Sequence, residues 1–260
     1  MMRRVLPLVP LSVLLLAALL AVLLSDGTPG RLTPELAWAP PAAGRVLGSG
    51  EGGVDLGLAL AHAELRGAVL AALVSLLGFG IGVPLGCAAA LYEGHFERVV
   101  VRVCDLLQAF PSFLLAVAVL SSVRAPSRLH IAIVFSVTAW IPFARMSLAE
   151  TRVLRNAAFV EAARALGLGR AQVLRKHIVP NVLGLASVQL GATAAALVVS
   201  EAALSFVGFG TKDGLSLGSL LDQGVVSMLR APHVLLAASV AVFVTSFSFM
   251  TAGRAFRPSS

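Results

Sequence analysis

The chain has 260 residues, of which 58% are hydrophobic and 13% charged, and its mean hydropathy is +0.91. A soluble domain carries roughly a quarter charged residues, so this composition excludes an ordinary soluble protein and indicates a membrane protein. The net charge of +7 does not indicate nucleic-acid binding, because the basic residues lie at the ends of apolar runs. Cys87 and Cys104 match no ligand spacing, so we expect neither a disulfide nor a metal site.

The first 24 residues predict a transmembrane helix. Arg3 and Arg4 precede a run of about twenty apolar residues, the length that crosses a bilayer. A cleaved signal peptide is the alternative, but its apolar region is about 7 to 15 residues long and ends in an A-x-A-like site. Residues 25–27 offer no such site, so we favour an uncleaved helix. Residues 25–66 are rich in proline and glycine and predict an external segment with little regular structure.

Five further apolar runs predict five more spans, each close to the roughly 20 residues that cross a bilayer. They cover residues 67–91, 99–123, 129–148, 183–206 and 233–252. Together with the first helix they make one all-α transmembrane protein of six spans.

Glycine and proline mark three of these spans. Gly78, Gly82 and Gly86 recur at steps of four, so they share one helical face and permit close approach of a neighbouring helix. Pro111 and Pro142 interrupt the third and fourth spans and free backbone carbonyls, which then need a neighbouring helix or water in a cavity. Bent helices suit a transporter, although inert bundles also contain them.

The distribution of Lys and Arg predicts the orientation. With the N-terminus inside, thirteen of the twenty Lys and Arg residues fall on the inner side and seven on the outer side. Inner loops of membrane proteins carry the excess of these residues. We therefore expect both termini, and the loop after the fourth span, to face the cytoplasm.

That loop contains a polar, basic stretch at residues 160–181, which predicts a pair of short helices. Asn156 is suited to cap the first helix, and Gly167 stands where a left-handed residue would end it. The second helix is expected to run from Arg170 until Pro180 stops it.

The first helix has a predicted apolar face, and the pair displays several basic side chains. The apolar face consists of Phe159, Ala162, Ala163 and Leu166, and the basic side chains are Arg164, Arg170, Arg175 and Lys176. Such an element is suited either to lie on anionic lipid headgroups or to dock on a protein. Physical considerations alone favour neither, but the residue pattern favours docking.

The same stretch resembles the E-A-A loop of ABC-type importer permeases. Its matching residues are Glu161, Ala162, Ala163, Gly167, Ile178 and Pro180, with Val179 in place of the usual Leu. Residues 81–86, 104–111 and 200–210 are similar to stretches of the dipeptide, oligopeptide and nickel permease family. This resemblance covers roughly residues 1–255, and its full combination of motifs is specific.

The resemblance implies a six-helix ABC type I importer permease fold with a cytoplasmic two-helix coupling loop at about residues 150–182. It divides the chain into a first helix with an external segment at residues 1–66, a core at 67–253 and a cytoplasmic tail at 254–260. The coupling loop would sit in a cleft of a separate ATP-binding subunit. In that position Ala162 and Ala163 keep the helix slim, Gly167 permits the turn, and Glu161 either makes a polar contact or braces the loop.

Partners and location follow from the same resemblance. It implies cytoplasmic ATP-binding subunits, a second and non-identical permease subunit, an external substrate-binding protein and the lipid of a bacterial-type inner membrane. The chain lacks a G-x-x-x-x-G-K-[ST] phosphate loop, an H-E-x-x-H motif and a G-x-S-x-G elbow, so we expect no enzyme, no cofactor and no metal site. Di- and oligopeptides are the expected substrates, and nickel or a metal chelate is the alternative.

Two observations bear on the pathway. Glu201 is the one acidic residue placed well inside a predicted span, so it is a candidate for the pathway or for helix packing, as are the three glycines and Pro111. An ion-coupled secondary carrier is a further alternative, but such carriers place several ionisable groups along the path.

The outer side departs from the family pattern. Where the family shows G-T-D-x-x-G-R-D, Gly50 and Val54 replace the first Asp and the Arg, and Leu217 stands at the Trp of an S-W-G pattern. These departures put in doubt the match to ordinary substrates and receptor partners.

Overall fold

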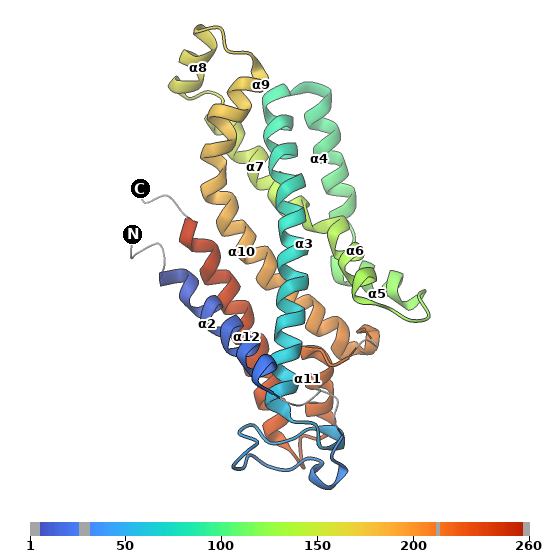
Figure 1. The fold of residues 1–260 in the computed structure, drawn as a ribbon. Coiled ribbons are helices and arrows are strands. Elements are labelled where there is room, and N and C mark those ends of the chain that lie inside the picture. The colour runs from blue at the N-terminus through green and yellow to red at the C-terminus, as the bar shows by residue number, and fades with distance from the viewer. Residues whose placement is uncertain (1–5, 26–31, 212–213, 257–260) are drawn as a thin grey trace.

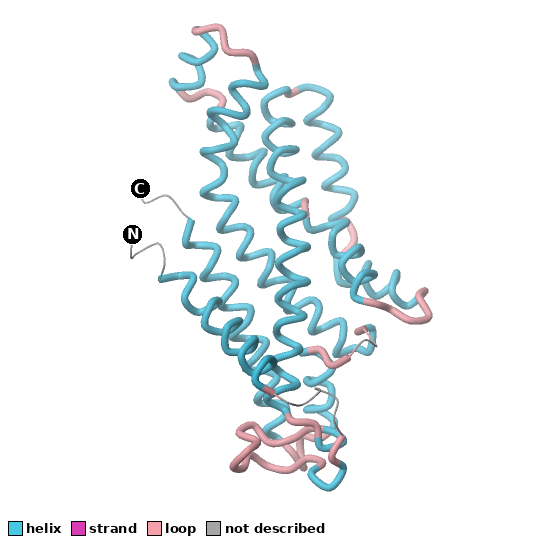
Figure 2. The backbone as a smooth tube through the Cα atoms, viewed as in Figure 1, coloured by secondary structure: helices cyan, strands magenta, loops and turns pink. Residues whose placement is uncertain are grey.

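The computed structural model describes residues 6–25, 32–211 and 214–256, and these form a long helical bundle (Figure 1). Of the residues used above for orientation, Arg3, Arg4, Arg31, Lys212 and Arg257 lie outside the described ranges. The α-helices are α2 Val9–Leu24, α3 Leu56–Tyr92, α4 Gly94–Gln108, α5 Ser112–Ser121, α6 Arg128–Ala139, α7 Ile141–Leu154, α8 Ala158–Ala165, α9 Arg170–Val173, α10 Val179–Leu204, α11 Leu217–Val226 and α12 Pro232–Ala252. Figure 2 shows that the longest loop region of the described chain lies at the end of the bundle opposite α8 and α9.

Four segments are long and apolar enough to cross a membrane: Leu56–Tyr92, Arg128–Leu154, Arg170–Phe209 and Pro232–Ala255. The pair α4 and α5, bent by 66° at the predicted break before Pro111, counts as a fifth. The first predicted span corresponds to α2, a shorter apolar helix of 16 residues that packs beside α3 and α12. The predicted all-α transmembrane fold is therefore confirmed.

The second span begins earlier than predicted, at Leu56 rather than Gly67. Asp55 caps it, since the Asp55 carboxylate accepts a hydrogen bond of 3.1 Å from the Leu58 amide. The added turns bury Leu56, Ala59 and Leu60 in the main apolar core. The prediction placed the start of this span at Gly67, whereas packing of one helical face against the core decides where α3 starts.

The segment before α3, which the sequence predicts to be external, has few regular elements but is held by hydrogen bonds. The Arg45 guanidinium donates to the Gly53 carbonyl at 2.6 Å and to the Thr33 hydroxyl at 3.0 Å. The Thr33 amide donates in turn to the Gly52 carbonyl at 2.9 Å. These bonds fold residues 32–55 into a cap over the end of α3.

The glycine stripe on α3 lies against the join between α6 and α7. A Cβ atom on Gly78, Gly82 or Gly86 would meet backbone carbonyls of Ala139, Trp140 and Ala144 respectively. Because backbone atoms cannot move aside, only glycine permits this contact. The stripe therefore fixes the broken fourth span against the longest helix of the bundle.

Candidate functional site

The predicted coupling loop forms a short helix, α8, followed by a turn at Gly167. The helix starts at Ala158 with Ala157 as its N-cap, so the predicted cap at Asn156 is wrong by one residue. Asn156 lies instead in the turn that follows α7, and its amide donates to the Val153 carbonyl at 3.4 Å. The chain thus leaves α7 and enters α8 within three residues.

Gly167 ends α8 in the left-handed conformation, as the sequence predicts, with φ of +83°. Its amide donates to the Arg164 carbonyl at 2.9 Å, and the Leu168 amide donates to the Ala163 carbonyl at 3.1 Å. These two bonds form a Schellman motif, which satisfies the last carbonyls of the helix. No atom lies within 4 Å of a Cβ placed on Gly167, so the position requires glycine for its backbone conformation and not for space.

The buried face of α8 differs from the predicted one. Val160 and Ala163 are buried, whereas Phe159 and Leu166 are 41% and 81% exposed and Ala162 is also exposed. Helical spacing identifies both apolar strips but not which of them packs on the chain's own core. The element therefore leaves a second strip, made of Phe159, Ala162 and Leu166, exposed at its surface.

The buried strip packs into a cluster at this end of the bundle, called here the α8-end cluster. It consists of Val83, Cys87, Leu91, Phe143, Val160, Ala163, Val173, Ile178, Val182 and Ala186, which come from α3, α7, α8, α9 and α10. The two-helix element is thus seated on its own apolar core.

Pro180 does not stop the second helix, and that prediction is wrong. The chain runs from α9 through one π-helical turn at Leu174–Ile178 into α10 as a single segment, Arg170–Phe209. Pro180 lies in the first turn of α10 and is exposed, while Ile178 is buried. The π turn shifts the hydrogen-bond pattern, so the missing N–H of proline falls where it costs little. The turn after α8 is therefore joined directly to a span.

Glu161 lies in the first turn of α8 with its side chain exposed. None of the ion pairs within the described residues includes it. Arg170, beyond the turn, places its guanidinium 6.0 Å from the ring centroid of Tyr92. Of the two predicted roles, an outward contact agrees better with this position than a brace does.

Three ion pairs join α4 and its cap to α7, the helix that leads into α8. They link Arg145 to Asp105, Arg152 to Glu97 at 2.6 Å, and Arg155 to Glu93 at 2.7 Å. Each pair is partly exposed and contributes little alone. All three pairs join α7 to α4 or to its N-cap residue, so they hold α4 beside the helix that leads into α8.

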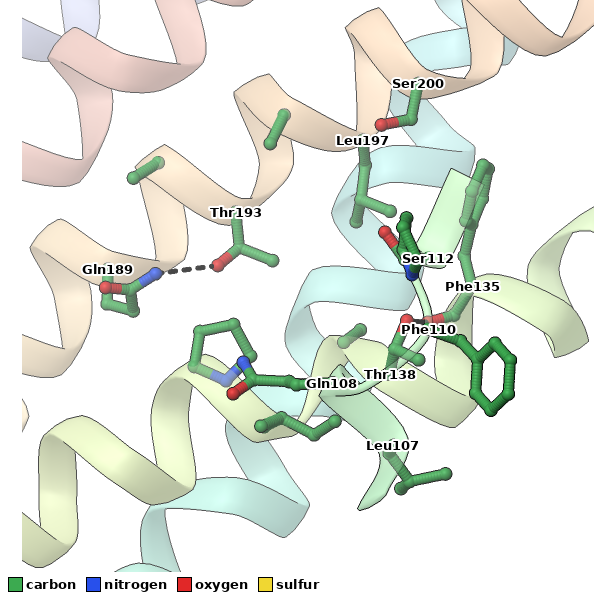
Figure 3. Close-up of a pocket in the computed structure, with 16 residues that line it drawn as sticks. Leu107, Gln108, Phe110, Ser112, Phe135, Thr138, Gln189, Thr193, Leu197 and Ser200 are labelled. Atoms are coloured by element: carbon green, nitrogen blue, oxygen red, sulfur yellow. Dashed lines mark hydrogen bonds between the residues drawn. The ribbon is translucent and has the colours of Figure 1, made fainter. Parts of the chain in front are cut away.

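A cavity of about 560 Å³ lies where both broken spans face α10. Pro111 and Pro142, at the two breaks, are among its lining residues. Polar side chains line it in Figure 3, with those of α10 on one side and those from the α4 end and α6 on the other. They are Gln108, Ser112, Thr138, Gln189, Thr193 and Ser200.

Within this cavity the Gln189 amide donates to the Thr193 hydroxyl at 3.1 Å. The lining is mostly apolar, with groups such as Phe135 and Leu197, and its polar side chains are all neutral. Such a surface suits a polar organic solute, since it offers hydrogen bonds without a fixed charge.

Glu201 does not line this cavity. It is 8% exposed and accepts a hydrogen bond of 3.1 Å from the Ser205 hydroxyl. It borders a small space near Gly67, Arg66 and Arg128, toward the opposite end of the bundle from α8. The structure thus separates this predicted site residue from the breaks at Pro111 and Pro142.

A second buried acid, Glu64, was missed by the prediction. It is 9% exposed and lies in the first turns of α3, which the prediction assigned to the external segment. The signal was present as Asp55 followed by apolar residues at helical spacing.

Two of the departures from the family pattern lie at one cavity beside the segment before α3. Gly50 and Val54 line this cavity of about 430 Å³ with Leu215 and Gln223. Leu217, at the start of α11, is instead buried in the main apolar core.

Known proteins match this chain over most of its length. Residues 82–259 match the family described as binding-protein-dependent transport system inner membrane component. The glutathione transport system permease protein GsiD of Pectobacterium atrosepticum is 32% identical over 183 residues, 70% of this chain and 60% of that protein. GsiD of Shigella dysenteriae is 34% identical over 184 residues, with the same coverage. The chain thus spans about three fifths of these relatives.

A longer alignment comes from Brucella suis, where a protein named for peptide transport as a permease is 31% identical over 252 residues. That alignment covers 96% of this chain and 84% of the relative.

Two solved structures of the MetNI methionine ABC transporter, in inward facing conformations, have the same fold. Their TM-scores are 0.61 and 0.62 at 19% and 21% sequence identity, and they cover 77% and 76% of this chain and 97% and 96% of the other. The fold is therefore that of a type I importer permease. This chain belongs to the family of binding-protein-dependent transport system inner membrane components, among the dipeptide and oligopeptide permeases.

Proposed function

We propose that the chain is a transmembrane permease subunit of an ATP-driven importer of di- and oligopeptides. The observation that carries this proposal is the α8 element, which packs inward through Val160 and Ala163 and leaves Phe159, Ala162 and Leu166 free for a partner. A separate ATPase would hold that outer strip and move α10 through the turn at Gly167. The chain itself would carry out no catalytic step.

The rest of the assembly follows from the family. A second, non-identical permease subunit would complete the pathway, and an external binding protein would deliver the substrate. Both termini and α8 would face the cytoplasm. Relatives named for glutathione and peptide transport support a small peptide as the solute, and the neutral polar lining of the 560 Å³ cavity suits one.

The test is ATP-dependent uptake of glutathione by the complete transporter reconstituted in vesicles. Gly167→Val should lower uptake by about ten-fold or more while membrane insertion is kept, because valine at φ of +83° strains the turn. Gly169→Ala is the matched control, since Gly169 lies in the same turn with ordinary φ of −68° and no atom within 4 Å of a Cβ.

Unchanged uptake and normal ATPase association in Gly167→Val would contradict the proposal. Transport by this chain in vesicles without any ATPase would favour an ion-coupled carrier instead. Inhibition by a nickel chelate but not by peptides would move the substrate to the metal-chelate alternative.

A further inference from the structure

Helix α4 carries an exposed apolar stripe. Phe96, Val99, Val103 and Leu106 recur at steps of three, four and three, so they lie on one helical face. They are 43%, 50%, 39% and 70% exposed. A neighbouring face of the helix packs on the bundle through the buried residues Val100 and Cys104. The stripe is therefore a surface that the described chain leaves open.

The spacing is that of a helix-packing seam. Apolar residues alternating at three and four steps form the a and d positions of a heptad, which insert into a facing helix. Phe110, in the break that follows α4, is 69% exposed. Phe110 also lines the 560 Å³ cavity. The stripe thus ends next to the break that borders the cavity.

The stripe differs from one that faces only lipid, although α4 and α5 together make a bent membrane span. Within its 15 residues α4 has the charged residues Glu97, Arg98, Arg102 and Asp105, and the two arginines are exposed beside the stripe. In Figure 1, α4 begins at the α8 end of the bundle, well beyond the start of α2 and the end of α12. Part of the α4 stripe therefore lies beyond the start of α2 and the end of α12, where it would be exposed to water.

Helix α12 provides the contrast. Leu236, Val240, Phe243, Phe247 and Met250 form a stripe of the same spacing that is 46% to 68% exposed. No Asp, Glu, Lys or Arg occurs in α12. A purely apolar helix of 21 residues is suited to lipid. Charged flanks, and not spacing, therefore set the α4 stripe apart.

We propose that the α4 stripe packs against a helix of a second, non-identical permease subunit, which presents an apolar stripe flanked by acidic residues. This inference rests on the proposed function and adds the face at which the two permeases meet. Neither Arg98 nor Arg102 is in an ion pair among the described residues, because Glu97 and Asp105 pair with α7. Arg98 donates instead to the Gly94 carbonyl at 3.2 Å and lies 3.2 Å from His95 Nδ1, so both guanidinium charges remain open to an outside carboxylate. A second copy of this chain would bring the same arginines and no further acid on α4.

The first experiment is photo-crosslinking in membranes that contain the complete transporter. p-Benzoylphenylalanine replaces Leu106 or, as a matched control of equal exposure, Phe243 on α12. Mass spectrometry of the adducts should identify a helix of the other permease for Leu106 and lipid for Phe243. Adducts from Leu106 only with lipid, with the ATPase or with another copy of this chain would overturn the inference, as would permease adducts from Phe243 alone.

The second experiment tests the charges. The double variant Arg98→Glu, Arg102→Glu should reduce the second permease that copurifies with this chain by about ten-fold, because it repels the acidic flanks. Arg230→Glu, an exposed position in the loop before α12, is the control. Normal copurification with the double variant would overturn the inference. If no permease or ATPase copurifies with the unaltered chain, the proposed function itself fails, so the two failures are distinguishable.

Discussion

The α8 end of the molecule and the cavity region use buried surface in opposite ways. At the α8 end, a short helix covers a continuous apolar cluster with Val160 and Ala163 and turns its other strip outward. At the cavity, two spans break near Pro111 and Pro142, and polar side chains line the space that results. Packing fills the α8 end of the bundle, whereas the interruption of two helices leaves a cavity near the middle of α10. Helix α10 belongs to both regions, so it joins them directly.

The largest effect is expected at the glycine stripe of α3, which packs against the broken fourth span. Gly82→Leu should destabilise the protein by about 3 kcal/mol or more, because the new side chain meets the backbone of Trp140 and Ala144. Gly80→Leu, on the same helix with no atom within 4 Å of a Cβ, should keep stability. Thermal unfolding in detergent measures both. Equal midpoints would mean that the α3 stripe does not fix the broken span.

A smaller effect is expected within the α8-end cluster. Val160→Ala should cost about 2 kcal/mol, since it removes two methyl groups from a fully buried site. Hydrogen exchange of the α8 amides should rise accordingly. Leu166→Ala, at a position 81% exposed, should leave exchange unchanged and weaken ATPase association. If Leu166→Ala raised the exchange and Val160→Ala weakened ATPase association, Leu166 would belong to the inward strip and Val160 to the outward one.

The smallest effect concerns the cavity lining. Thr138→Val keeps side-chain volume but removes a hydroxyl that lines the cavity, so KM for peptide uptake should rise about three- to ten-fold. Stability should stay the same. Thr245→Val is the control, because Thr245 is buried in α12 and its hydroxyl has no hydrogen-bond partner among the described residues. An equal rise in KM for both variants would remove the cavity from the pathway.

Backbone chemistry explains what the sequence by itself determined. The break before Pro111, the break at Pro142 and the left-handed turn at Gly167 are local requirements of proline and glycine, so they can be predicted without any partner. The apolar runs likewise predicted a transmembrane bundle, because their length and composition match a bilayer. The motif around Glu161 identified the family for the same reason, since it is a short continuous pattern.

Only the tertiary structure decided which surfaces meet. The start of α3 at Leu56, the buried face of α8 and the passage of the chain through Pro180 all depend on contacts between residues far apart in sequence. Proline ends a helix in isolation, but a π turn before it and packing of Ile178 into the α8-end cluster allow the helix to continue. Burial of one face against another element is a property of the assembled bundle, so no local pattern could have specified it.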